Sequence, residues 1–318
     1  MHTQHRNSTT RRARVLHWLT CLAIGAISSL SVTVQAGEIA LSFDDAPRPD
    51  GHYFSSAQRS QHLLEQLRLA GVQEALFFVT TSNLTENNRP QLLAYAAAGH
   101  KLANHSHRHS RPDALGPAGF REDLRLADAR LRSLPGFLPL FRFPFLDEGK
   151  TADTHRDLLQ ALADHGYRNG YVTVDNYDWF LDAQFQEALK AGKSIDYDKL
   201  RQVYLDLLWQ SILFYDRIAV QQLGRSPRHV LLLHENDLAA LFIADLVRHI
   251  RAQGWTVIPA SQAYQDPIAE PIPDTVFHGQ GRVAALAAAN GVKRRELVPD
   301  SEDEAWLQNH LQEQAVFQ

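Results

Sequence analysis

The sequence has almost no cysteine. Its only cysteine is Cys21, which lies in an apolar N-terminal run. The chain beyond that run therefore has no disulfide, no thiolate nucleophile and no cysteine-ligated metal. Any metal ion there must be held by carboxylates and by some of the 16 histidines. A chain of 318 residues, 44% hydrophobic and 21% charged, buries a core large enough to fold without disulfide bonds.

Acidic residues are absent from the first 36 residues, which carry four arginines before an apolar run from Val15 to Val34. Small residues stand at the positions that a signal peptidase reads, in Val34-Gln-Ala36. We predict a secretory signal peptide over residues 1–36, cleaved before Gly37, and hence an exported protein that is periplasmic or secreted. The alternative is an uncleaved N-terminal anchor. The choice between the Sec and twin-arginine export routes stays open.

The chain also lacks a second apolar run long enough to span a bilayer. Signal cleavage would remove four arginines and no acids, so the formal net charge would change from −4 to −8. An acidic protein is a poor partner for nucleic acid or for an anionic membrane surface. We therefore expect no nucleic-acid partner and no stable membrane anchor after cleavage. Nothing in the sequence implies a protein partner, and the oligomeric state stays open.

Strand patterns alternate with helical patterns along the rest of the chain. This alternation predicts an α/β fold with a parallel sheet, and the number of units favours an irregular (β/α) barrel of mostly parallel strands. Strands are expected at 39–43, 75–80, 101–104, 140–143, 170–174, 230–233 and 256–258, and helices at 56–70, 90–98, 119–133, 154–165, 197–223 and 239–253.

The predicted barrel domain covers residues 37–267, and the composition changes after it. Residues 180–228 include a charged loop at 190–199 and are expected to cover one side of a groove. Residues 268–318 are predicted to be a C-terminal extension packed on the barrel, because they are too short for a core of their own. Ser301 and Glu304 have the spacing of a capping box that would open a last helix.

Polar side chains follow the expected strands, at positions that share one edge of a parallel sheet. Taken alone, each has a structural explanation as well as a functional one. His105 and His109 would face the same way on one helical turn, which suits a shared metal, or they would form a solvated turn. An aspartate pair commonly caps a turn, and His234 could be a core histidine bonded to a carbonyl. The shared placement of all these residues favours function. The residues at the five strand ends are Asp44 and Asp45, His105 and His109, Arg142, Asp175 and Asp178, and His234.

The ordered motifs resemble those of the NodB-type polysaccharide deacetylases, a family of metal-dependent carbohydrate esterases. SFDDAP, HSHRH, RFPF, DNYDW and LLH stand in the order of that family from about Ile39 to Pro259. The resemblance implies a hydrolase of carbon–nitrogen bonds in linear amides that removes acetyl groups from N-acetylglucosamine-containing glycans, either peptidoglycan or chitin-type oligosaccharides. An O-acetyl esterase on xylan or an exopolysaccharide is the alternative. A non-catalytic glycan-binding protein is a third possibility.

The resemblance also implies a metal site and a general base. Asp45, His105 and His109 would bind one divalent metal, most often zinc in this family, and cobalt, nickel and manganese are compatible with the same ligands. Asp44 would take a proton from a metal-bound water that attacks the acetyl carbonyl. Arg142 would hold Asp44 in place and keep it ionised.

The remaining motif residues would serve the leaving group and the substrate. His234 would protonate the leaving amine as general acid, and Asp178 would orient it. The backbone N–H of Phe145 would stabilise the oxyanion. Leu232 would line the pocket for the acetyl methyl group, and Trp179 would form a groove wall against a sugar ring.

Overall fold

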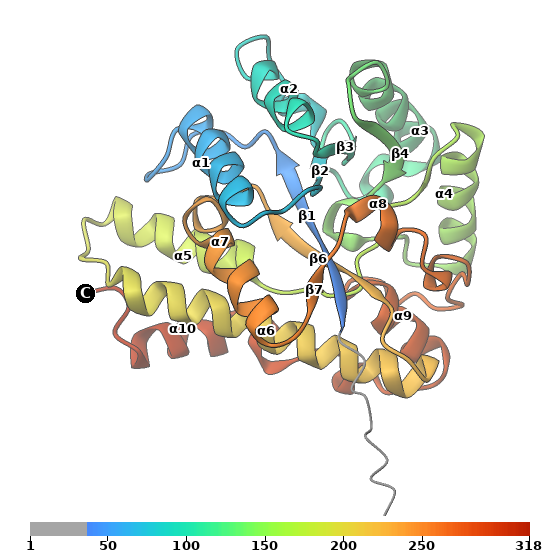
Figure 1. Cartoon of the computed structure of the whole chain (residues 1–318). Helices are drawn as coiled ribbons and strands as arrows, with labels where there is room; N and C mark the ends of the chain where they lie inside the picture. The colour runs from blue at the N-terminus through green and yellow to red at the C-terminus, as the bar shows by residue number, and fades with distance from the viewer. Residues whose placement is uncertain (1–36) are drawn as a thin grey trace, which may run out of the picture. The chain divides into compact units, whose positions relative to one another are not determined.

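The architecture is a curled parallel sheet surrounded by helices (Figure 1). The structure is a computed structural model and describes residues 37–318, so the predicted signal peptide lies outside the described residues. The strand order is β5-β4-β3-β2-β1-β6, and β7 pairs with the start of β1. The strands are β1 (Glu38–Ala46), β2 (Leu76–Val79), β3 (Lys101–Asn104), β4 (Phe137–Phe141), β5 (Arg168–Asn169), β6 (Arg228–His234) and β7 (Thr256–Val257).

The segment that follows β5 joins the two edges of the sheet. The N–H of Gly170 donates to the carbonyl of Phe141 in β4 (2.7 Å), and the N–H of Thr173 donates to the carbonyl of Val230 in β6 (3.0 Å). The predicted strand at 170–174 is therefore divided between two neighbours, which explains why only short pieces of it pair. The sheet closes into an irregular barrel, and the fold class predicted from the sequence is confirmed.

Helices follow the strands and cover the outside of the sheet (Figure 1). Most lie where their apolar periodicity predicts, but α3 begins earlier, before a kink at Gly116 (φ 66°), and α5 was not predicted. The charged residues at 190–199 indicate a loop, whereas the apolar residues that precede them are buried by α5. The helices are α1 (Ser56–Leu69), α2 (Arg89–Ala97), α3 (Pro112–Leu131), α4 (Ala152–Asp164), α5 (Asp178–Lys190), α6 (Tyr197–Leu223), α7 (Asp237–Ala252) and α8 (Ala260–Ala263), with 3₁₀ turns η1 (Thr81–Asn83), η2 (Pro144–Leu146) and η3 (Pro267–Ala269).

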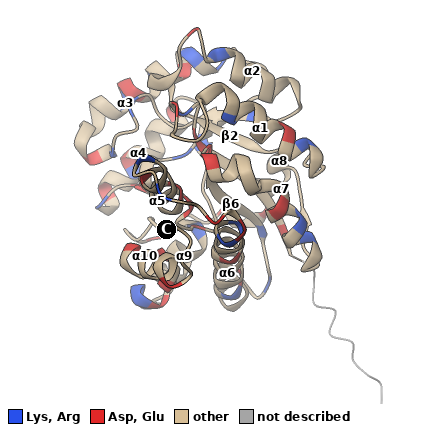
Figure 2. Ribbon diagram, turned by 90° about the vertical axis from the view of Figure 1, so that its left-hand side faces the viewer, with Lys and Arg blue, Asp and Glu red and all other residues tan. Residues whose placement is uncertain are grey.

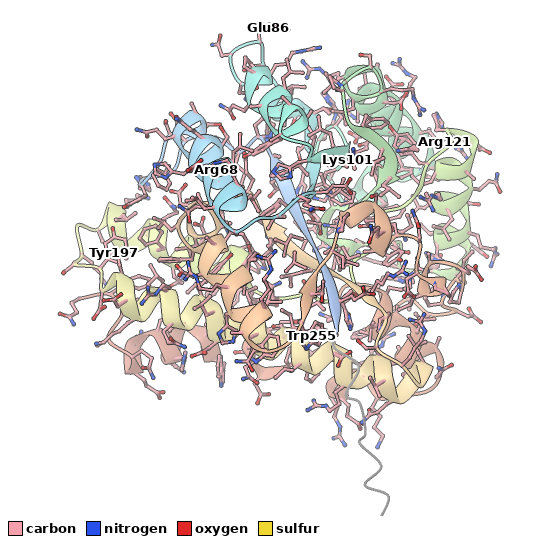
Figure 3. All side chains as sticks on the ribbon, viewed as in Figure 1. Arg68, Glu86, Lys101, Arg121, Tyr197 and Trp255 are labelled. Atoms are coloured by element: carbon pink, nitrogen blue, oxygen red, sulfur yellow. The ribbon has the colours of Figure 1, made fainter. Side chains whose placement is uncertain are left out.

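The core runs along β1, which is buried on both faces. Phe43 stacks on Phe77 of β2 with ring centroids 5.0 Å apart. Each such fully buried aromatic or aliphatic side chain contributes about 1.5–3 kcal/mol. At the start of β1, Trp255 lies against Gly37, where an added Cβ would come within 2.5 Å of the indole ring (Figure 3). Only glycine fits at that position.

The C-terminal extension packs beneath α6 (Figure 1) through α9 (Gly281–Ala289) and α10 (Glu304–Glu313). Its 3₁₀ turns are η4 (Arg294–Glu296) and η5 (Asp300–Glu302). The hydroxyl of Tyr215 in α6 donates to Glu302 (2.8 Å). The predicted capping box is wrong. Asp303 caps α10 by accepting from the N–H of Trp306 (2.8 Å), because Ser301 belongs to the preceding 3₁₀ turn.

Charged residues of both signs are interspersed over the outer helices (Figure 2). Many form exposed pairs within one helix, such as Arg68 with Glu65, and such pairs add little stability. Among the described residues, no helix is both long and apolar enough to cross a membrane. Other charged residues are buried, and several of these lie at the C-terminal ends of the strands.

Candidate metal and active site

The predicted site residues converge at the C-terminal edge of the sheet. Asp44 and His234 occupy paired positions on the neighbouring strands β1 and β6. His105 follows β3 directly, and Arg142 follows β4. Asp178 is the first residue of α5. Residues that are far apart in the sequence thus meet because parallel strands end together.

Asp45, His105 and His109 form a cluster that fits one divalent cation. The Oδ1 atom of Asp45 lies 3.3 Å from Nε2 of His109 and 3.8 Å from Nε2 of His105. Three potential ligand atoms lie within 4.8 Å of one another. Ligands on a tetrahedral zinc ion are about 3.4 Å apart, given metal–ligand bonds of about 2.1 Å. Two histidines and one carboxylate leave a coordination position for water or substrate.

The loop that carries the two histidines differs from the expected helical turn. Ser106 (φ 73°) and His109 (φ 52°) both lie in the left-handed region, and α3 begins only after them. Side chains hold this bend, because Asn104 Oδ1 accepts from the N–H of Ser106 (2.7 Å) and Ser106 Oγ accepts from the N–H of His109 (2.9 Å). His107 turns away to Thr81 Oγ1 (2.9 Å), outside the cluster.

The protonation of the cluster suits a cation. His105 Nδ1 lies 3.0 Å from the carbonyl of Arg142, a partner that requires N–H there and leaves the lone pair of Nε2 facing Asp45. Burial, aided by the neighbouring His105, lowers the pKa of His109 to about 4, so its imidazole is neutral. Burial alone would raise the pKa of Asp45, but the surrounding histidines and Arg48 outweigh it and lower that pKa to about 2.

The backbone conformation directs the side chains of Asp44 and Asp45 away from each other. Asp45 has φ 68°, a strained conformation for a residue other than glycine, which turns the two adjacent carboxylates to different partners. Asp44 is buried, and its Oδ1 accepts from Nη1 of Arg142 at 2.6 Å. Its Oδ2 lies 3.5 Å from Nε2 of His105. Asp44 therefore lies beside the candidate metal cluster, but its carboxylate is bound to Arg142.

Arg142 is fully buried and uses most of its hydrogen-bonding capacity. Its Nε donates to the carbonyl of Gly170 (2.8 Å), and its Nη2 donates to the hydroxyl of Tyr264 (2.9 Å). Its guanidinium also lies 3.8 Å from the centroid of the Phe78 ring. Such a fixed cation pairs with Asp44 and holds its carboxylate in one orientation. Sequence reasoning missed Tyr264, because nothing local marks it among the tyrosines of the chain.

His234, which is 15% exposed, and the buried Asp178 form a second pair. Nδ1 of His234 lies 2.7 Å from Oδ1 of Asp178, and the backbone N–H of His234 donates to Oδ2 (2.9 Å). Asn236 Nδ2 also donates to Oδ2 (3.1 Å), and the sequence marks it only as a helix cap before α7. Burial alone would lower the pKa of His234, but Asp178 reverses this and raises it to about 9. The imidazole is therefore protonated at neutral pH.

Asp175, to which sequence reasoning assigned no role, lies in the same region. It is buried, and burial raises the pKa of its carboxyl to about 7. Its only sequence signal is its place at the end of the paired segment that closes the sheet.

Two aromatic side chains line the rim of the site. Phe145 is 50% exposed, and its ring centroid lies 4.7 Å from that of His109. Its φ of 58° leaves its N–H without an acceptor among the described residues. Trp179 is 37% exposed at the start of α5. Leu232 is buried in a small apolar cluster with Leu146 and Val172.

Comparison with known proteins gives the class of the chain. Residues 31–170 match the polysaccharide deacetylase family, which confirms the predicted resemblance. This matched region contains the aspartate pair, the histidine pair and Arg142, and it ends before Asp178 and His234. This similarity agrees with the enzyme class predicted from the motifs, a hydrolase of acetylated glycans, and the polysaccharide deacetylase family is in general metal-dependent.

Several solved structures are similar to the chain. A family 4 carbohydrate esterase from Streptomyces lividans in complex with acetate is 23% identical, over 71% of this chain and 95% of that one (TM-score 0.47). The catalytic domain of a peptidoglycan N-acetylglucosamine deacetylase from Eubacterium rectale is 20% identical, over 72% and 90% (TM-score 0.49). A family 4 pseudoenzyme from Bacillus anthracis is 18% identical, over 72% and 66% (TM-score 0.45). A search of curated proteins found no match.

Proposed function

We propose that this protein is an exported hydrolase that removes acetyl groups from N-acetylglucosamine units of a glycan, either peptidoglycan or a chitin-type oligosaccharide. One observation carries the proposal. Two separate ion pairs, Asp44 with Arg142 and His234 with Asp178, flank one cluster of two histidines and a carboxylate. Amide hydrolysis needs a base, an acid and an electrophilic centre at close quarters.

Asp45, His105 and His109 would hold the cation, and zinc is the ion that this ligand set suits best. When bound, such an ion supplies Lewis acidity that activates water and stabilises negative charge on oxygen. The neutral His109 and the ionised Asp45 are in the protonation states that ligands need.

Asp44 acts as the general base in this proposal. The guanidinium of Arg142 donates to its Oδ1, which leaves Oδ2 to accept a proton from the attacking water. The carboxylate of Asp45 would serve the cation and so lose basicity. The division of work between two adjacent aspartates rests on the φ of 68° at Asp45, which directs their side chains to different partners.

His234 supplies the proton that an amine leaving group needs. Nδ1 is bonded to Asp178, so Nε2 is the nitrogen that carries a transferable proton. A protonated imidazole is of most use when the leaving group is an amine, because amines leave poorly without a proton, whereas an alcohol from an ester needs less help. This feature supports the N-acetyl substrate over the O-acetyl one.

The rim residues would bind the sugar and the acetyl group. The unpaired N–H of Phe145 can donate to the developing oxyanion. The exposed face of Trp179 can pack against a pyranose ring, and Leu232 contributes to an apolar wall next to the cluster. No side chain in this set fixes the length of the glycan.

The test is acetate release by the purified protein from chitopentaose, peptidoglycan fragments and acetylated xylan, each with and without a chelator. We expect chelator-sensitive release from one of the two N-acetylated substrates, restored by zinc. Release from acetylated xylan alone would replace the proposal with an O-acetyl esterase. A zinc-loaded protein that binds a glycan and releases no acetate from any substrate would be a binding protein.

A further inference from the structure

A second cluster of two histidines and a carboxylate lies away from the strand ends. Glu148 follows the turn η2, His155 lies in α4, and His278 belongs to the C-terminal extension just before α9. Their potential ligand atoms lie within 4.8 Å of one another. The extension runs beside α4 in this region (Figure 1), and a cleft of about 380 Å³ lined by Glu148 and His155 lies between them.

The distances in this cluster match those between ligands of one ion. Oε2 of Glu148 lies 3.7 Å from Nδ1 of His155 and 3.9 Å from Nδ1 of His278. These separations are too long for direct hydrogen bonds, which need about 2.7–3.2 Å. They are close to the separation of about 3.4 Å between ligands on tetrahedral zinc. The corresponding distances at Asp45 are 3.3 and 3.8 Å.

The charge of Glu148 is uncompensated by any other side chain. Its side chain is only 13% exposed. Among residues 37–318, no lysine or arginine nitrogen lies within 4 Å of it, and its carboxylate accepts no hydrogen bond. Shielding a carboxylate from water is unfavourable unless it is paired or coordinates a cation. A cation between the carboxylate and the two rings would remove this cost.

The two imidazoles are buried and stack on each other, with ring centroids 4.5 Å apart and planes inclined by 17°. The Nε2 atoms of His155 and His278 have no hydrogen-bond partner among the described residues, although buried ring nitrogens normally have one. One contact opposes metal binding through Nδ1, namely the 3.0 Å contact of His155 Nδ1 with the carbonyl of Glu148. Binding an ion through Nδ1 would exchange that contact for a metal bond and place the ring proton on Nε2, so the case for the ion rests on the distances to Nδ1 and on the burial of the ligands.

We propose that Glu148, His155 and His278 bind a second zinc ion, which ties the C-terminal extension to the barrel. Both histidines are almost fully buried, so the ion would be shielded from solvent, which suits a structural role. The three ligands come from three separate segments, so the ion would cross-link the η2 loop, α4 and the extension. Because η2 also carries Phe145, the ion would steady the loop at the rim of the first site.

The experiment measures bound zinc per chain after loading with zinc and gel filtration, together with the melting temperature. We expect two zinc ions in the wild-type protein, one in His278→Gln and one in His109→Gln, because each variant disables one cluster. His249→Gln is the matched control, since His249 also has a buried Nε2 without a partner but belongs to neither cluster. It should keep two ions.

The second readout separates a failure to fold from a loss of zinc. In the His109→Gln background, zinc should raise the melting temperature by several degrees, because an ion that binds only the folded state stabilises it. Adding Glu148→Gln, which keeps the shape of the side chain, should abolish that rise while the circular dichroism stays unchanged. One zinc ion in the wild-type protein, with no change in His278→Gln, would overturn the proposal. An unchanged melting response in the Glu148→Gln background would overturn it as well.

Discussion

Two clusters of the same composition lie in different settings in this protein. In the first, the side chains of Asp45 and His109 are 23% and 28% exposed, and the cluster adjoins a buried base and a buried acid. In the second, Glu148 is 13% exposed, both histidines are buried, and among residues 37–318 Glu148 forms an ion pair only with these two histidines. The same three ligands can therefore serve either an open catalytic site or a closed structural one.

The difference lies in what surrounds the ligands. At the first cluster, His105 is fixed by the carbonyl of Arg142, and the guanidinium of that same residue fixes Asp44. At the second cluster, the Nε2 atoms of both histidines have no hydrogen-bond partner within residues 37–318. A catalytic metal site needs ligands that other groups orient by hydrogen bonds, and it needs access for substrate. A cross-linking site needs only ligands from three segments that meet.

The largest expected effect separates the two clusters by activity. His109→Gln should lower acetate release by about 10³-fold or more, since a metal contributes several kcal/mol to such a reaction. His278→Gln should change the rate by less than about threefold, because the second cluster touches no reacting group in our account. Initial rates at saturating zinc give the comparison. Equal losses in both variants would break the distinction between an open and a closed site.

The next effect concerns stability around the first cluster. Arg142→Ala should reduce the free energy of unfolding by about 3–5 kcal/mol, because it leaves Asp44 as an uncompensated buried charge. Chemical denaturation measures this loss. Arg68→Ala is the control, since its pair with Glu65 is exposed on α1 and should matter little. A similar small cost in both variants would show that Asp44 is not held by a buried ion pair.

The variant His234→Asn tests the role of His234 as general acid. Hydrolysis of an N-acetylated glycan should fall by about 10²–10³-fold, whereas hydrolysis of an activated acetate ester should fall much less, because its leaving group needs no proton. The ratio of the two rates is the measurement. Equal losses on amide and ester would assign His234 to binding or to structure.

A smaller effect is the pH dependence of stability in chelator-treated protein. The pKa of His234 is raised from 6.5 to about 9 in the fold. Its contribution to stability is therefore fully present below about pH 6.5 and is lost as the pH rises through about 9. Urea denaturation between pH 6 and 10 should show this decline, and Asp178→Asn should flatten it. An identical decline in Asp178→Asn would assign it to other groups.

Much of the first site could be predicted from the sequence, because parallel strands bring their C-terminal residues together whatever the details of the loops. Asp45, His105 and His109 meet as that rule requires. The means by which the two histidines converge was mispredicted, because left-handed φ angles at Ser106 and His109 replace the helical turn. Residues other than glycine adopt such angles only rarely, and the enrichment of histidine among them is too weak to mark His109 in advance.

The second cluster could not be predicted. Glu148 and His278 are far apart in the sequence and follow no strand, so no periodic pattern places them together. The path of the extension decides their meeting, and that path depends on packing such as the contact of Gly281 with Val172, where an added Cβ would come within 2.8 Å of the valine. Tertiary contacts of this kind leave no mark in a single sequence.

The most direct test of our central claim compares Asp44→Asn with Asp45→Asn, two changes at adjacent residues. Asp44→Asn should keep the zinc of the first cluster and lose acetate release from the N-acetylated glycan, since it removes only the base. Asp45→Asn should lose both. If Asp44→Asn released acetate at the wild-type rate, or lost its zinc as Asp45→Asn does, the division of work between the two aspartates would be contradicted.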